Sequence, residues 1–184
     1  MELLDIVDEN GIPTGETVDR EAAHKEGIRH RTSHVWLLRT HNGKTQVLLQ
    51  KRSLNKDSYP GCYDISSAGH IPAGDGFLES ALRELKEELG VHAAEEELVY
   101  CGQRQFEYHK IFRGREFWDN QVSNVYVLWR DMTAAEFVIQ ESEVDSVLWM
   151  DWDTCIDMVK NNSAPHCIRM KELEMVSSKV QVIC

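Results

Sequence analysis

The segment from Gly69 to Val91, GHIPAGDGFLESALRELKEELGV, constrains the chain more than any other part of the sequence. Its second half predicts a helix, because apolar residues recur every three or four positions and form one stripe: Leu78, Ala81, Leu82, Leu85 and Leu89. Glu84, Glu87 and Glu88 then share a second face, where three carboxylates repel one another. A divalent cation such as Mg²⁺, which prefers oxygen ligands, would offset this repulsion. The segment therefore predicts a helix with a cation site on its polar face.

The residues before this helix predict a tight loop. Gly69 and Gly74 allow the backbone to approach a ligand closely. Asp75 is a residue type that caps free N–H groups at a helix start and interacts favourably with the positive end of the helix dipole. The alternative interpretation is an acidic, solvent-exposed helix that ends at Gly90 and binds no ion.

Length and charge limit the class of protein. We predict a single domain over residues 1–184, since this length is sufficient for a substantial core. The net charge of −11 argues against a nucleic acid polymer as partner and suits a protein that admits a small anionic substrate only with a metal bound. No apolar run is as long as a membrane span, and MELLDIVDEN lacks a basic and then apolar signal. We therefore predict a cytoplasmic protein without a membrane partner.

The five cysteines are odd in number and include no CxxC pair, so we expect reduced thiols. Turn signals and apolar periodicity predict a hairpin over residues 1–18 and a short helix from Asp19, its cap, to Glu26. The other predicted strands are 33–39, 46–52, 63–68, 98–108, 116–129 and 144–150, and the other predicted helices are 154–160, capped by Asp151 or Asp153, and 164–177. This mixture predicts a layered α/β or mixed α+β domain.

The segment 69–91 resembles the Nudix box, a pattern written G-x5-E-x7-R-E-U-x-E-E-x-G-U in which U is a bulky aliphatic residue. Eight of its nine fixed positions match: Gly69, Arg83, Glu84, Leu85, Glu87, Glu88, Gly90 and Val91. The ninth position holds Asp75 in place of Glu, which keeps the charge but shortens the reach. The resemblance implies a Nudix-type α/β/α sandwich with a mixed sheet and a loop–helix–loop metal site.

The same resemblance implies a Nudix hydrolase, in which water attacks one phosphorus of a diphosphate linked to another group, often a nucleoside. Mg²⁺ or Mn²⁺ would be the cofactor. The implied metal ligands are the Gly69 carbonyl and the carboxylates of Glu84, Glu87 and Glu88. Glu84 is either a ligand or the group that orients and deprotonates water, and Arg83 is expected to hold Glu87 through a charge-assisted hydrogen bond. The expected catalytic residues are thus Glu84, Arg83 and Glu87.

Residues outside the box supply further candidates. Glu141 and Glu143 are candidates for an additional metal ligand or base, with solvated loop charges as the alternative. The resemblance implies that Arg52 and Lys56 contact substrate phosphates, with plain surface charge as the alternative. Aromatic residues at strand spacing are candidates for stacking on a base or, alternatively, for the core: Tyr63, Phe106 and Trp118.

Short motifs over residues 4–149 resemble the subgroup that includes isopentenyl-diphosphate isomerase: Asp8-Glu9, His24, His30-Arg31, Gln50-Lys51-Arg52, Pro60-Gly61 and Gly69-His70. That enzyme needs a Cys two residues before the His of its Gly-His pair, and Ala68 stands there. Asp119 and Gln121 match its two later glutamates, and a Gln cannot accept a proton. We therefore predict a hydrolase, with isopentenyl-diphosphate delta-isomerase as the alternative.

Three histidines, His24, His30 and His70, match residues that help to hold a transition metal in that isomerase. Imidazoles suit zinc or manganese-like ions, so the three are candidates for a second metal site. The alternative is that they are structural histidines with hydrogen-bond partners. The family resemblance also suggests a homodimer.

Overall fold

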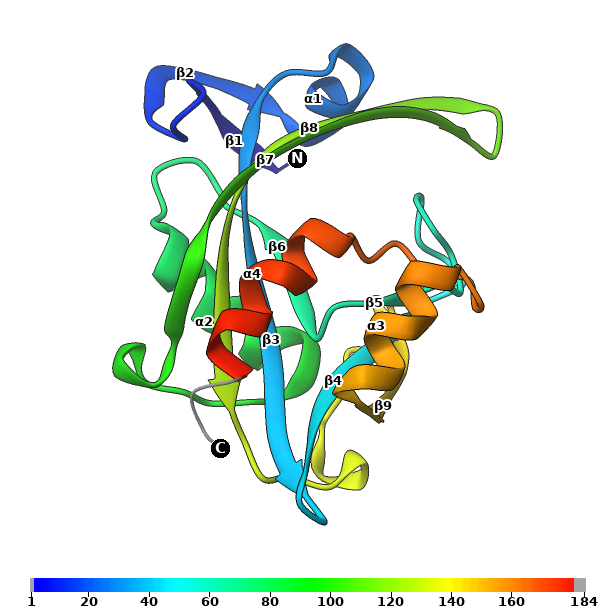
Figure 1. The fold of residues 1–184 in the computed structure, drawn as a ribbon. Coiled ribbons are helices and arrows are strands. Elements are labelled where there is room, and N and C mark those ends of the chain that lie inside the picture. Colours follow the sequence, from blue (N-terminus) through cyan, green and yellow to red (C-terminus); the bar gives the residue numbers. More distant parts are fainter. Residues whose placement is uncertain (1, 181–184) are drawn as a thin grey trace.

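The computed structural model describes residues 2–180, and a seven-stranded mixed sheet forms its centre (Figure 1). The main strand order is β5-β4-β3-β8-β7, with β6 paired to β3 and β9 paired to β4. Among the strand pairs of this sheet in the described residues, only β3 and β8 run parallel, and the others are antiparallel. The strands are β3 (His30–His41), β4 (Lys44–Arg52), β5 (Tyr63–Asp64), β6 (Ser67–His70), β7 (Val99–Phe112), β8 (Arg115–Trp129) and β9 (Val144–Asp151).

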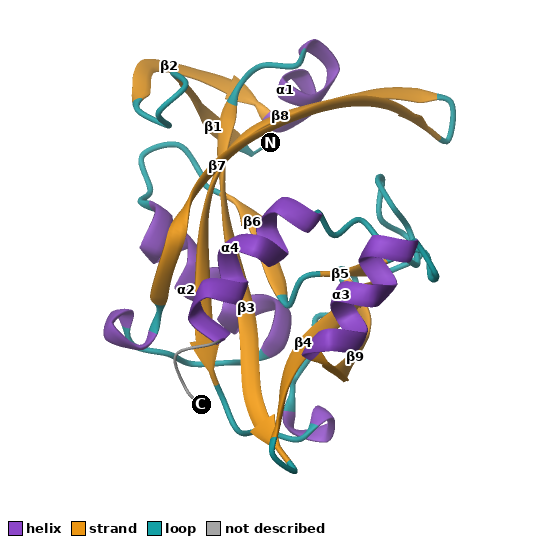
Figure 2. Cartoon of the chain, viewed as in Figure 1, coloured by secondary structure: helices purple, strands orange, loops and turns teal. Residues whose placement is uncertain are grey.

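Helices cover both faces of this sheet (Figure 2). On one face α2 (Phe77–Leu89) packs over β3, β8 and β4, and on the other α3 (Trp152–Asn161) and α4 (Met170–Val180) pack over the same strands. A separate hairpin of β1 (Leu3–Val7) and β2 (Pro13–Asp19) leads into α1 (Arg20–Glu26), which lies beside β8. The layers form an α/β/α sandwich, which confirms the predicted fold class.

The apolar stripe predicted for the box helix is present in α2. Ala81, Leu85 and Leu89 are fully buried against the sheet, and Leu78 and Leu82 lie at its margin. The chain leaves the helix at Gly90, whose positive φ of 67° lets its N–H donate to the last carbonyls. A helix that buries one face in this way has a fixed rotation about its axis, which determines where its acidic face points.

The predicted cap at Asp75 is wrong. The N-cap of α2 is Gly76, and no side chain caps the helix there. Asp75 lies one residue too early, in a turn where its N–H donates to the Pro72 carbonyl and its own carbonyl accepts a hydrogen bond from Arg31. The cap predicted at Asp19 is confirmed, since its carboxylate accepts the N–H of Glu21 at 3.0 Å.

The last helix begins later than the sequence predicts, at Met170 rather than residue 164. Residues 165–167 remain extended because they pair with Tyr63: the Tyr63 N–H donates to the Pro165 carbonyl, and the Cys167 N–H donates to the Tyr63 carbonyl. Asp151 is the residue before α3, but its carboxylate accepts hydrogen bonds from side chains of β4 and leaves the helix start uncapped.

The predicted strand 63–68 is divided into β5 and β6, and β7 and β8 are both longer than predicted. Beyond the last pair with β3, residues 108–119 continue as a two-stranded ribbon that curves away from the sheet (Figure 1). The cysteines in the described residues carry free thiols, as expected, and Cys184 lies outside those residues. Among residues 2–180, no helix combines the length and apolar character needed to cross a bilayer.

Candidate functional site

Two adjoining cavities lie where α1, α2, β6 and the ribbon meet. The smaller, of about 190 Å³, covers the polar face of α2, and the larger, of about 1380 Å³, opens between α1, the ribbon and the loop that follows β4. Residues that line both cavities join them into one continuous space: Glu2, Arg20, Lys56, Ala68, Gly69, His70 and Glu143.

The three box carboxylates line the smaller cavity at different depths. The side chain of Glu87 is 51% exposed and that of Glu84 is 15% exposed, whereas Glu88 as a residue is only 5% exposed. Their spacing on α2 explains this order, because Glu88 lies nearest to the buried stripe and Glu87 furthest from it. Burial therefore increases from Glu87 through Glu84 to Glu88 on one face of the helix.

Glu88 is a buried carboxylate that forms no ion pair with any described residue. Burial, and next to it the charge of Glu84, raise its pKa to about 8, and its Oε2 has no hydrogen-bond partner. Burial also raises the pKa of Glu84. A buried polar atom without a partner is costly, and a nearby cation would favour the charged form of both groups. Hard oxygen donors arranged in this way fit a divalent cation such as Mg²⁺ or Mn²⁺.

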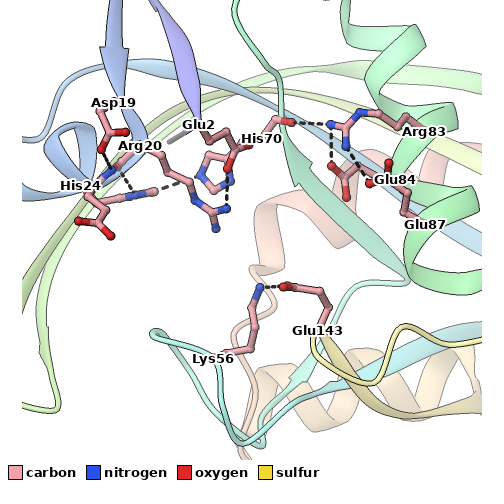
Figure 3. A network of polar contacts seen from close by, with 11 residues as sticks. Glu2, Asp19, Arg20, His24, Lys56, His70, Arg83, Glu84, Glu87 and Glu143 are labelled. Carbon is pink, nitrogen blue, oxygen red and sulfur yellow. Dashed lines mark hydrogen bonds and ion pairs between the residues drawn. The ribbon is translucent and has the colours of Figure 1, made fainter.

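Arg83 holds two of these carboxylates in place (Figure 3). Its Nη1 lies 2.9 Å from Glu87 Oε2, which confirms the predicted contact, and its Nη2 lies 2.8 Å from Glu84 Oε1. Nη2 also donates to the His70 carbonyl at 3.3 Å, which ties α2 to β6. The planar guanidinium is thus a positioning group for both glutamates.

Gly69 lies in close contact with the side chain of Glu84. A Cβ atom at this position would overlap the carboxyl end of Glu84, so a larger residue would displace that carboxylate. Gly69 pairs with Ser33 in the β3–β6 ladder, which fixes its backbone beside Glu84 on α2.

Of the two later glutamates, the structure brings only Glu143 to the site. Glu143 lines both cavities and forms an ion pair with Lys56 (Figure 3), whereas Glu141 is exposed and lines neither. Arg52 lines the larger cavity, where its Nη1 lies 2.9 Å from Asp64 Oδ2 and its Nε donates to the Ser58 carbonyl. Both predicted phosphate contacts therefore lie on the cavity wall, each with a carboxylate partner.

The three candidate histidines form a tight cluster beside the box. The Nδ1 of His24 donates to the Arg20 carbonyl at 3.0 Å, and the Nδ1 of His30 donates to the Ile28 carbonyl at 2.9 Å. The Nε2 of His30 has no hydrogen-bond partner among the described residues, whereas the Nε2 of His24 lies 3.3 Å from the Nε2 of His70 and shares a hydrogen bond with it. One ligand atom of each histidine lies within 4.8 Å of the others. Burial lowers the pKa of His24 to about 3 and that of His70 well below its usual value, so the rings are neutral.

Asp119 adds a carboxylate to this cluster. Its Oδ1 lies 3.8 Å from His24 Nε2 and 3.7 Å from His30 Nε2 and has no hydrogen-bond partner, while Gln121 donates to Oδ2. Burial raises the pKa of Asp119 to about 6. Neutral imidazoles oriented by backbone carbonyls, together with a carboxylate, form a ligand set that suits a transition metal.

The inner wall of the larger cavity contains residues that the sequence did not single out. Arg104 and Tyr108 flank Phe106 on β7, and Arg169 precedes α4. Behind them Glu172 is buried and accepts hydrogen bonds at 2.9 Å from His34 Nδ1 and Trp36 Nε1; its other oxygen lies 2.9 Å from Arg104 Nε. The alternation of residues 104, 106 and 108 is a signal that they share one face, but it cannot reveal a partner on α4.

Of the candidate stacking residues, Phe106 alone lines a cavity. Trp118 lies against Gly27, and its Nε1 donates to Glu107, while Tyr63 is half-buried beside the core. Where the isomerase has its thiol, Ala68 lines both cavities. Cys167 also lines the larger cavity, and burial raises the pKa of its thiol.

Comparison with known proteins places this chain in a family. The model of the NUDIX domain matches residues 29–167. Nudix hydrolase 3 of Arabidopsis thaliana is 36% identical over 156 residues, which cover 83% of this chain but only 19% of that protein. An uncharacterised Nudix hydrolase of Clostridium acetobutylicum is 33% identical over 160 residues, which cover 87% of this chain and 75% of the relative.

Solved structures show the same fold. A Deinococcus radiodurans protein superposes with a TM-score of 0.67 at 18% identity, with 96% of this chain and 98% of that chain covered. The NUDIX domain of Shewanella oneidensis NrtR, complexed with ADP ribose, gives a TM-score of 0.61 at 17% identity, with 89% and 94% covered. Since the domain model spans most of the chain and the relatives are identical at about a third of the aligned positions, the chain belongs to the Nudix hydrolase family.

Proposed function

We propose that this protein is a metal-dependent hydrolase that cleaves a diphosphate bond in a nucleoside diphosphate derivative or a similar small molecule. The observation that carries the proposal is Glu88, a buried carboxylate with an unpartnered oxygen next to Glu84. A protein gains no stability from such a pair unless a cation binds between them. The family to which the chain belongs supports hydrolysis as the reaction.

Glu84, Glu87, Glu88 and the Gly69 carbonyl would hold Mg²⁺ or Mn²⁺. When bound, this cation would neutralise charge on the phosphate oxygens and lower the pKa of a water ligand. Arg83 keeps Glu84 and Glu87 turned toward the cavity. The raised pKa of Glu84 suits a group that accepts a proton from the attacking water.

Lys56 and Arg52 would bind the phosphates. Lys56 is paired with Glu143 where the two cavities meet, so a phosphate that takes over Lys56 would release the Glu143 carboxylate. The freed carboxylate would then face the box and serve as the further ligand or base. Substrate binding would thus release the carboxylate that the metal site still needs.

The test is a hydrolysis assay on a panel of nucleoside and sugar diphosphates with Mg²⁺ or Mn²⁺. We expect Glu84→Gln to lower kcat by about 100-fold or more, since a displaced ligand or base costs several kcal/mol in the barrier. Glu79→Gln, an exposed residue on the same helix, is the matched control. Equal turnover by wild type and Glu84→Gln would contradict the proposal.

The histidine cluster, with Asp119, is proposed as a second cation site of transition-metal character. The closeness of the three ligand atoms, the unpartnered Nε2 of His30 and the unpartnered Oδ1 of Asp119 favour it over purely structural histidines. Calorimetric titration with Zn²⁺ or Mn²⁺ should show a site that His30→Gln removes and that the exposed His41→Gln retains. The same binding curve for wild type and His30→Gln would rule the site out.

The alternative activity, isopentenyl-diphosphate delta-isomerase, is testable in the same protein. Because Ala68 and Gln121 stand where the isomerase needs proton-transfer groups, we expect no exchange when isopentenyl diphosphate is incubated in deuterated water. We also propose a homodimer, which light scattering would measure directly.

A further inference from the structure

Arg169 is a cavity-lining cation without a carboxylate partner. The other described cations that line the cavity and are at least partly buried each have a carboxylate partner: Arg20 with Glu2, Arg52 with Asp64, Lys56 with Glu143 and Arg104 with Glu172. Within residues 2–180, no Asp or Glu oxygen lies within 4.0 Å of the Arg169 guanidinium. Its one hydrogen bond joins Nη2 to the Tyr59 hydroxyl at 3.2 Å, and a guanidinium has five N–H donors.

Aromatic rings hold this guanidinium in position. Its central carbon lies 4.6 Å from the ring centre of Phe106 and 5.5 Å from that of Tyr108, and the Tyr59 ring lies 6.0 Å from that of Tyr108. Tyr59 lies in the loop that follows β4 and adopts a positive φ of 48° there. The stacking uses the faces of the cation and leaves the edge donors free to meet an acceptor.

Arg169 and the carboxylates of α2 lie in different cavities of the same continuous space. Arg169 lines only the larger cavity, whereas the carboxylates of α2 line only the smaller one. A diphosphate held at α2 would therefore extend the rest of its molecule past Lys56 into the space that Arg169 faces. With a volume of about 1380 Å³, that space is large enough for a nucleoside-sized group.

We infer that the substrate carries a second anionic group, a phosphate or a carboxylate, on the part of the molecule remote from the cleaved diphosphate, and that Arg169 binds it. The rings of Phe106, Tyr108 and Tyr59 contact the skeleton that links the two anionic ends. The inference rests on the proposed function for the location of the diphosphate, but the pairing of Arg169 with an anion does not depend on hydrolysis. Arg169 is thus a specificity-determining residue.

Matched diphosphates test the inference because each pair differs in one remote anionic group: coenzyme A against 3′-dephospho-coenzyme A, ADP-ribose 2′-phosphate against ADP-ribose, and UDP-glucuronate against UDP-glucose. We expect wild type to favour the more anionic member of at least one pair by about tenfold or more in kcat/KM, since a charge-assisted hydrogen bond contributes that much. Arg169→Gln should abolish the preference, because it should lower kcat/KM for the more anionic member by about tenfold more than for the less anionic member. Lys171→Gln, an exposed residue of α4 with the same charge change, should retain it.

Calorimetric binding of the same pairs to Glu84→Gln in Mg²⁺ separates this inference from the proposed function. A preference in binding that Arg169→Gln removes supports the inference even if wild type hydrolyses none of the compounds, which would contradict only the proposed function. Absence of any preference, a preference that survives Arg169→Gln, or an equal loss for both members would overturn the inference. An equal loss would mean that Arg169 only supports the aromatic wall.

Discussion

Glu172 compensates the charge of Arg104, which lines the larger cavity and is itself buried. It is almost completely buried on α4 and meets charged or polar groups from two strands, His34 and Trp36 on β3 and Arg104 on β7. Burial alone would raise the pKa of Glu172, but the charge and hydrogen bond of His34, with Arg104 and Trp36, lower it to about 2. The carboxylate is therefore ionised inside the protein.

Replacing Glu172 by Gln should lower the free energy of unfolding by about 3 kcal/mol or more, because it leaves the buried Arg104 charge without compensation. Urea denaturation at neutral pH measures this loss. Glu174→Gln, an exposed residue on the same helix, should change stability by less than about 0.5 kcal/mol. A loss of the same size in both variants would contradict the buried role of Glu172.

The Glu172 carboxylate should provide a stabilisation that depends on pH. Its pKa is about 2 in the folded protein against an ordinary value of 4.5, so its stabilisation is fully present above pH 4.5 and is lost as the pH falls toward 2. Between these values the free energy of unfolding should fall more steeply with decreasing pH in wild type than in Glu172→Gln. Parallel pH profiles for the two proteins would show that Glu172 keeps its ordinary pKa in the fold.

At the scale of elements, α2 packs one face against the core and presents its acidic face to the smaller cavity. Leu85 is fully buried, and its truncation to Ala should lower the free energy of unfolding by about 2–5 kcal/mol. Lys86→Ala, one position along and exposed, should be nearly neutral. Thermal or urea unfolding of the two variants measures the difference, and equal stabilities would mean that α2 is not fixed by its apolar stripe.

The sequence predicted this helix well because its information is local. The stripe ending at Leu89 and the contact from Arg83 to Glu87 both follow from a period of 3.6 residues. The predicted cap at Asp75 is wrong because the exact start of a helix depends on only one or two residues. The predicted start of the last helix is wrong because residues 165–167 pair with Tyr63, which is far away in the sequence. The Arg104–Glu172 pair spans 68 residues and was beyond any local pattern.

At the scale of the whole molecule, metal binding in the smaller cavity should raise the free energy of unfolding. Mg²⁺ at 100 times its Kd should raise the free energy of unfolding by about 2.7 kcal/mol, because the ion binds only the folded protein. Melting curves with and without Mg²⁺ measure the shift. Glu88→Gln should lose the shift, and Glu79→Gln should retain it; an unchanged shift in Glu88→Gln would exclude Glu88 as a ligand.

The ribbon of residues 108–119 has a separate consequence for how such proteins diversify. In the described chain its backbone pairs only with itself, although its rings, such as Tyr108 and Phe117, form part of the large cavity. Insertions or replacements at its tip would leave the register of the layers beneath undisturbed. An exchange of this arm would therefore change the shape and chemistry of the large cavity while α2 and its carboxylates keep their place in the fold.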